Sequence, residues 1–149
     1  MARIVVCAVI ASLLLSGCDR AVGPEDQIVV RGRAPTAARL SERVDFAVIA
    51  RNPGERSVRV SGLSCAAVGV EVRSRSTLVW QSYLGPQLSC ATILHLAPGD
   101  SSSFSIAWDG RDNLDRFVEP GTYDVRIGLV RGDRLVAADP QRYPLVIRP

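Results

Sequence analysis

The sequence predicts an all-β protein, an antiparallel β-sandwich of about 7–9 strands that follows an N-terminal signal peptide. Three observations predict it. Short stretches of alternating apolar and polar residues recur along the chain, Gly, Pro and Asn turn signals separate them, and helical periodicity is hard to find after the first fifteen residues. The 149 residues, 47% hydrophobic and 22% charged, have the size and composition of one globular domain with a short appendage.

The N-terminal segment has the features of an export signal with a lipid attachment site. Arg3 precedes the apolar run Ile4–Leu15, which is too short to span a bilayer but suits the core of a signal peptide. The following Leu15-Ser16-Gly17-Cys18 resembles a bacterial lipobox. This resemblance implies cleavage before Cys18, a diacylglycerol on its thiol and an acyl chain on its new amino group. An ordinary secretory signal or a buried N-terminal strand is the alternative.

These features divide the chain into three expected parts. Residues 1–17 are the predicted lipoprotein signal peptide, residues 18–27 the lipidated cysteine with a polar tether, and residues 28–149 the sandwich domain. The expected membrane partner is reached through the lipid on Cys18, because several acyl chains hold a protein far more firmly than one. We therefore expect an extracytoplasmic protein, anchored by lipid to the cell membrane or the outer membrane.

The four cysteines predict one disulfide bond. Cys7 leaves with the signal peptide and Cys18 carries lipid, so Cys65 and Cys90 can pair only with each other. An extracytoplasmic location favours oxidation, and closing a loop of about 25 residues stabilises the fold by about 3 kcal/mol in the loop-entropy account. Free buried thiols are the alternative.

The strand pattern favours an immunoglobulin-like sandwich. In the first clear alternation Val44, Phe46, Val48 and Ala50 share one face, and Asn52-Pro53-Gly54 then turns the chain. The expected strands are residues 44–51, 57–61, 68–73, 78–80, 91–96, 103–108, 123–129, 135–136 and 143–147, the last two forming a hairpin. Short strands with turns at intervals of about ten residues are typical of this architecture.

A family resemblance appears in the second half of the chain. Pro98-Gly99, then Trp108-Asp109-Gly110, then Pro120-Gly121-Thr122-Tyr123 occur in the order seen in the BsuPI-type intracellular proteinase inhibitor domain, which this chain resembles from Val44 to Val130. The resemblance implies an immunoglobulin-like sandwich and a role in proteinase inhibition. Two features depart from it, since Asp115 stands where the family usually has Gly, and the namesake is cytosolic whereas this chain is predicted to be exported.

We expect the motif residues to have structural roles before any functional one. Trp108 ends an alternating strand and is expected in the core, and Gly121 is expected to serve the turn. Tyr123 resembles a tyrosine corner, in which the hydroxyl bonds back to nearby backbone.

No pattern of catalytic, metal-binding or cofactor-binding residues stands out. Asp109, Asp112 and Asp115 recur every third residue, but they lack the order of an EF-hand loop, and a solvated turn is the simpler interpretation. His95 is the single histidine, has no nucleophile motif near it, and is expected on the wet face of a strand. We predict neither an enzyme nor a cofactor.

The basic residues also argue against nucleic-acid binding. All 18 are arginine, they are dispersed, and the formal net charge is only +3. Arg73 and Arg75 on one strand face either anionic lipid headgroups or simply water.

The functional hypothesis is therefore a lipid-anchored, non-enzymatic envelope module that binds another envelope protein through its loops or an edge strand. The alternative is a proteinase inhibitor that acts on a protease through an exposed loop. Ser82–Ser89 and Asp109–Pro120 are the candidate loops.

Overall fold

The computed structural model describes residues 23–63, 66–83 and 92–149. The lipobox with Cys18, and both Cys65 and Cys90, lie outside these residues, so the predicted lipidation and disulfide remain predictions. The elements are the short 3-10 helix η1 (Pro24–Gln27) and the strands β1 (Val29–Arg33), β2 (Ala37–Arg39), β3 (Val44–Arg51), β4 (Val58–Leu63), β5 (Val68–Ser74), β6 (Thr77–Gln81), β7 (Thr92–Leu96), β8 (Ser101–Trp108), β9 (Gly121–Arg131), β10 (Arg134–Val136) and β11 (Tyr143–Arg148).

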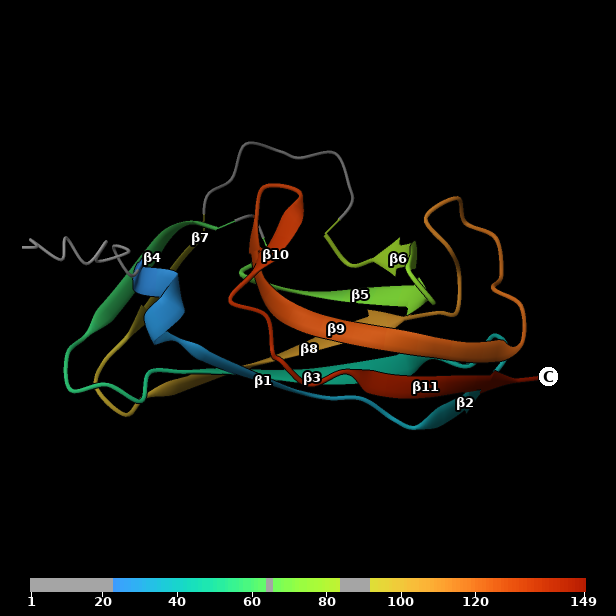
Figure 1. The fold of residues 1–149 in the computed structure, drawn as a ribbon, viewed down its shortest axis with the longest axis horizontal. Helices are drawn as coiled ribbons and strands as arrows, with labels where there is room; N and C mark the ends of the chain where they lie inside the picture. Colours follow the sequence, from blue (N-terminus) through green and yellow to red (C-terminus); the bar gives the residue numbers. More distant parts are fainter. Residues whose placement is uncertain (1–22, 64–65, 84–91) are drawn as a thin grey trace, which may run out of the picture.

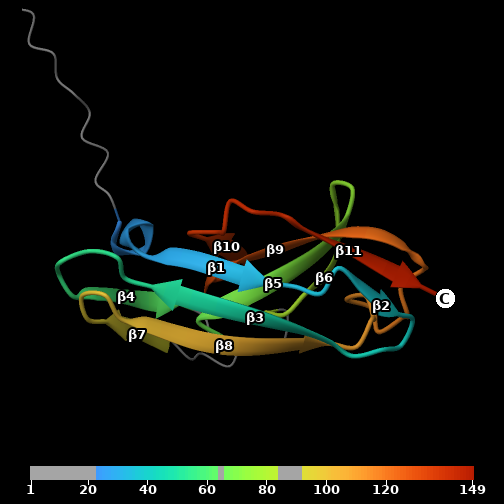
Figure 2. The ribbon, with the colours of Figure 1, turned by 90° about the horizontal axis from the view of Figure 1, so that it is seen from below.

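Two sheets pack face to face, and the predicted immunoglobulin-like sandwich is confirmed. The smaller sheet has the order β1-β3-β8, and the larger has the order β2-β11-β9-β5-β6 with β10 attached to β9. Figure 2 shows the smaller sheet in front of the larger one, with their strands running along the long axis of the molecule. Each sheet buries one face, which explains the alternation along its strands.

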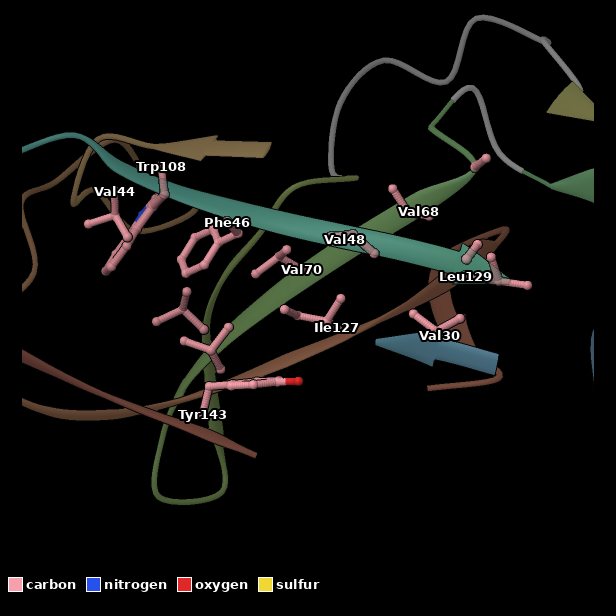
Figure 3. Packing of buried hydrophobic residues seen from close by; sticks show 14 of the residues in the cluster. Val30, Val44, Phe46, Val48, Val68, Val70, Trp108, Ile127, Leu129 and Tyr143 are labelled. Atoms are coloured by element: carbon pink, nitrogen blue, oxygen red, sulfur yellow. The ribbon is translucent and has the colours of Figure 1, made fainter. Parts of the chain in front are cut away.

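The core lies between these two faces. Phe46, Val48, Val70 and Ile127 are fully buried, and Trp108 closes one end of the cluster (Figure 3). The inward face predicted for residues 44–50 is confirmed, because Val44, Phe46, Val48 and Ala50 alternate with exposed neighbours. Their side chains supply the apolar burial that holds the sheets together.

The predicted C-terminal hairpin is wrong. β10 and β11 do not pair with each other, because each pairs antiparallel with β9. Gly132 explains the first pairing, since its φ of +63° fits the first loop position of a tight two-residue turn that folds β10 directly back onto β9. The chain then continues along the same edge of β9, the one opposite β5, and pairs with it again as β11.

The parallel pairing of β2 with β11 is a further feature that the alternation did not predict. β1 belongs to the smaller sheet, and the connection through Thr36 moves the chain to the edge of the larger sheet. There Thr36 accepts a hydrogen bond from the Val146 backbone at 3.0 Å, and the Leu40 N–H donates to the Arg148 carbonyl at 2.7 Å.

β4 and β7 form a two-stranded ribbon that continues from β3 and β8 around a corner at one end of the sandwich (Figure 1). Asn52 occupies this corner and is fully buried. Its side-chain amide donates to the carbonyls of Arg56, Leu96 and Ala97 at 2.8–3.1 Å, and its oxygen accepts from the Gly54 N–H at 3.0 Å. One side chain thus satisfies backbone groups of both connections.

η1 lies at the same end, against β4. It falls within the segment that the sequence indicated as tether, and its Glu25 is paired with Arg131 of β9 at 2.9 Å. Over the three described ranges, no helix has the length and apolarity needed to cross a bilayer.

A candidate binding loop between β8 and β9

Residues 109–120 connect β8 to β9 and form a small hairpin of their own, here called the 109–120 loop. It lies at the end of the molecule opposite η1 and beside β6 (Figure 1). The Val118 N–H donates to the Gly110 carbonyl at 2.9 Å, and the Asp112 N–H donates to the Arg116 carbonyl at 2.8 Å. A β-bridge between Arg111 and Phe117 lies between these two bonds. Such pairing fixes the backbone of a connection that is otherwise irregular.

The base of the loop is an aromatic cluster that contains two of the motif residues. Trp108 is 1% exposed and its indole N–H donates to the Arg111 carbonyl at 2.6 Å. Tyr123 packs edge-on to Trp108, with ring centroids 6.4 Å apart, and Trp80 of β6 packs at 5.8 Å on a tilted plane. The Tyr123 hydroxyl donates to the Glu119 carbonyl at 2.6 Å, so both ends of the loop are bonded to buried rings.

The other motif residues lie at the loop boundaries. Gly110 has a φ of +78°, a conformation that side chains rarely adopt, which explains the residue type. Asp109 accepts the Arg111 N–H at 3.2 Å. Pro120 is exposed, and Gly121 begins β9. The structure thus places Trp108, Asp109, Gly110, Pro120, Gly121 and Tyr123 around the base of one loop.

Asp112 organises the tip of the loop. One carboxylate oxygen accepts the N–H groups of Leu114 and Arg116 at 2.8 and 3.0 Å, and the other accepts the Arg116 guanidinium at 2.7 Å. The hydrogen bonds from Arg116 and its positive charge hold the pKa of the Asp112 carboxyl below its usual value. The tip is therefore closed by a carboxylate that stays ionised at neutral pH.

The turn at the tip has the left-handed residue that this hairpin type requires. Asp115 donates its N–H to the Asp112 carbonyl at 3.0 Å and has a φ of +62°. It stands at the position where the resembling family usually has Gly, and Asp is among the residues that tolerate this geometry.

Arg111 lies along the side of the loop. Its guanidinium is 3.4 Å from carboxylate oxygens of both Asp109 and Asp115 and stacks 4.0 Å from the centre of the Phe117 ring. The acids at 109, 112 and 115 are thus each engaged by an arginine. In the parts of the chain that the structure describes, no three His, Cys, Asp or Glu side chains gather in a way that would hold a metal ion.

Asn113 attaches the loop to the body of the protein. Its N–H donates to the Val79 carbonyl at 3.1 Å, and its side-chain oxygen accepts the Gln81 N–H at 3.1 Å. Val79 and Gln81 lie on β6, the edge strand of the larger sheet, so the loop satisfies backbone groups at this edge.

Two large apolar side chains are left exposed by this arrangement. Leu114 at the tip is 71% exposed, and Phe117 is 47% exposed. A hollow of about 290 Å³ in the same region is lined by Trp80 and Gln81 of β6 and by Asp109, Arg111, Asp112, Asn113 and Asp115 of the loop. Apolar side chains held in water by an ordered backbone are a feature of binding surfaces.

The sequence predicted this segment as a candidate binding loop, but it did not single out Leu114, Phe117 or Asn113. The available signal was the pair of large apolar residues inside a highly charged turn, Asp109–Pro120. Of the other candidate residues, His95 lies on the exposed face of β7, opposite Arg59, and most of the Ser82–Ser89 loop falls outside the described residues.

Comparisons with known proteins place the fold. No protein-family pattern matches the chain, and no curated protein matches its sequence. Among solved structures, a β-glucosidase from Erythrobacter marinus aligns with a TM-score of 0.51 at 17% identity, over 80% of this chain and 15% of the enzyme. A β-glucosidase from Listeria innocua gives 0.50 at 14% identity, over 82% and 16%. A CARDB domain from Pyrococcus furiosus gives 0.47 at 12% identity, over 82% and 94%.

This chain is an immunoglobulin-like β-sandwich. At these identities the alignments show the fold alone. The chain matches about one sixth of each glucosidase, so the alignments transfer no glucosidase activity to it.

Proposed function

We propose that this protein is a non-enzymatic binding module of the cell envelope, anchored by a lipid on Cys18, which contacts another protein through the 109–120 loop. The observation that carries the proposal is the exposure of Leu114 and Phe117 on a backbone that Asp112, Asn113 and Trp108 hold in place. A loop that is ordered before binding loses little conformational entropy on docking, and its exposed apolar side chains supply the favourable burial.

The position of the loop agrees with an anchor at Cys18. Gly23, the first described residue, is five positions after Cys18, and five residues span at most about 18 Å. The anchor therefore attaches near the η1 end of the molecule, and the 109–120 loop lies at the opposite end (Figure 1). A partner reaches the loop without approaching the membrane surface.

Site-specific photocrosslinking tests this proposal. In the test variant, a photoreactive residue replaces Leu114 in the full chain, which is expressed in the cell envelope. In the control variant it replaces Ile49, a residue of β3 whose side chain is 44% exposed. We expect a covalent adduct of defined mass at position 114 and none at position 49. The Asp112→Ala change, which opens the tip, should reduce the adduct. Equal labelling at both positions, or no adduct at 114, would contradict the proposal.

Proteinase inhibition is the second candidate, and the exposed Leu114 favours it, because a protease needs an accessible side chain to engage. The turn at the tip of the 109–120 loop argues against binding to a protease in the manner of a substrate. The Asp115 N–H donates to the Asp112 carbonyl at 3.0 Å, so the backbone at the tip is not extended. A panel of serine proteases incubated with the full chain separates the two functions. Inhibition that Leu114→Ser removes would establish the second candidate, and full protease activity across the panel would discard it.

A further inference from the structure

The outer face of the larger sheet carries a second surface of interest, whose lining residues do not include those of the 109–120 loop. Two adjoining hollows of about 410 and 440 Å³ lie over β5, β9 and the segment that leads into β11. Both are lined by Arg73, Arg126 and Arg142, and one or the other also includes Arg75 or Arg134. We call the two hollows together the arginine groove.

The strand register brings two of these arginines side by side. Tyr143 of β11 pairs with Val125 of β9, and continuing this antiparallel register by one residue sets Arg142 beside Arg126. Like charges opposite each other on a sheet are destabilising, and Glu71, the acid opposite Arg126 on the β5 side, is paired with Arg73 rather than with Arg126.

The acids that line the groove do not neutralise it. Glu71 is already engaged by Arg73 at 2.8 Å and by the Tyr83 hydroxyl at 2.6 Å. Asp139 is buried, and its carboxylate accepts bonds from Gly32, Tyr143 and Gln141. Asp124 is the remaining acid in the lining.

Three of the groove arginines have no side-chain partner within the described ranges. Among the described residues, Arg126, Arg134 and Arg142 make no side-chain hydrogen bond and no ion pair, whereas Arg73 is held in place by Glu71 and the Ser76 carbonyl. The groove therefore presents an excess of positive charge with free guanidinium N–H donors.

We propose that the arginine groove binds a ligand that carries phosphoryl groups, with Arg126 and Arg142 as its principal contacts. The planar guanidinium donates two parallel N–H bonds to phosphate oxygens and is the side chain best suited to this group. Hollows of this size hold more than a bare ion. Because the two hollows share three arginines, one ligand with two phosphoryl groups can occupy both of them. A soluble phosphorylated compound and an anionic lipid headgroup both offer this chemistry.

Thermal unfolding of the full chain with inorganic pyrophosphate, against sodium chloride at equal ionic strength, tests the soluble source. We expect saturating pyrophosphate to raise the unfolding temperature by about 5 °C. The double change Arg126→Ala/Arg142→Ala should weaken binding at least about tenfold. The matched control, Arg51→Ala/Arg59→Ala, removes the same charge from exposed positions of β3 and β4 and should bind as the parent does.

Co-sedimentation with vesicles tests the lipid source. Phosphatidylcholine vesicles measure attachment through the N-terminal segment, and vesicles with added phosphatidylglycerol measure the contribution of the groove. Preference for phosphatidylglycerol that the groove variant loses and the control variant keeps supports a lipid headgroup, and a pyrophosphate effect alone supports a soluble ligand. The proposal is overturned if neither anion has an effect, or if the groove variant responds as strongly as the parent and the control.

Discussion

Single buried polar residues hold the two sheets in their relative positions. The Asp139 side chain is fully buried and accepts the Tyr143 hydroxyl at 2.6 Å, the Gly32 N–H at 2.9 Å and the Gln141 N–H at 3.0 Å. Gly32 belongs to the smaller sheet and Tyr143 to the larger, so one carboxylate joins them. A Cβ at position 32 would lie 2.2 Å from the Ile127 side chain, so the close approach of the two sheets requires glycine here.

The ionisation of the Asp139 carboxyl should make the stability of the folded protein depend on pH. Burial by itself raises the pKa of Asp139, but the hydrogen bonds from Tyr143, Gln141 and Gly32, with the charge of Arg31, outweigh it and hold the pKa below its usual value. Because the folded pKa is lower than the unfolded one, the stabilisation is fully present above about pH 4 and is lost as pH falls through the folded pKa. Urea midpoints, followed by tryptophan fluorescence from pH 7 to pH 2, should therefore decline towards acid.

The Asp139→Asn variant should be less stable at pH 7 and should show a flatter acid decline. Asp139→Ala, which leaves the Tyr143 hydroxyl and the Gly32 N–H without their acceptor, should cost about 3 kcal/mol. The matched control is Asp45→Asn, because Asp45 is 57% exposed and Arg43 is its ion-pair partner among the described residues. An acid decline as steep in Asp139→Asn as in the parent would show that other groups cause it.

At the scale of elements, the corner at Asn52 turns one pair of strands into the next. β3 and β8 pair up to Arg51 and Ser101, and β4 and β7 continue the ribbon from Val58 and Leu96. The connections between them expose backbone carbonyls that no ladder satisfies, and the Asn52 amide bonds three of them. The ribbon is therefore positioned by one side chain rather than by a continuous ladder.

Removal of this side chain should be strongly destabilising. Asn52→Ala leaves buried carbonyls unpaired and opens a cavity, so we expect a loss of about 3 kcal/mol in the free energy of unfolding. Asn52→Asp keeps the acceptor for Gly54 but lacks the amide donors and buries a charge, so it should cost at least as much. Urea unfolding measures both. A loss under about 1 kcal/mol in either variant would mean that the corner is held by other contacts.

At the scale of the whole molecule, the sandwich separates three surfaces along its length. η1 marks the end near the proposed anchor, the arginine groove lies on the outer face of the larger sheet, and the 109–120 loop lies at the far end (Figure 1). Cys65 and Cys90 lie outside the described residues, and their disulfide bond stays a prediction from the sequence.

Mass spectrometry of the mature protein tests the anchor and the disulfide together. We expect a chain that begins at Cys18 and carries a diacylglycerol and an acyl chain, and an inhibitor of lipoprotein signal peptidase should make the heavier precursor accumulate. Cys65 and Cys90 should react with an alkylating agent only after reduction, and reduction should lower stability by about 3 kcal/mol. Cys18→Ser serves as the unlipidated control. An uncleaved, unmodified chain with free thiols would contradict both assignments.

The sequence by itself determined the all-β class, the inward faces of the strands and several turns, because a period of two and the backbone needs of Gly, Pro and Asn are local properties. Val44, Phe46, Val48 and Ala50 are buried as their alternation indicates. The tertiary structure alone decided which strands meet. The pairing of β11 with β9, the parallel β2–β11 pair and the burial of Asn52 and Asp139 depend on partners distant in sequence. The exposure of Leu114 and the proximity of Arg126 to Arg142 arise in the same way. Only the packing of separate strands decides whether a side chain is buried and which other side chains lie next to it.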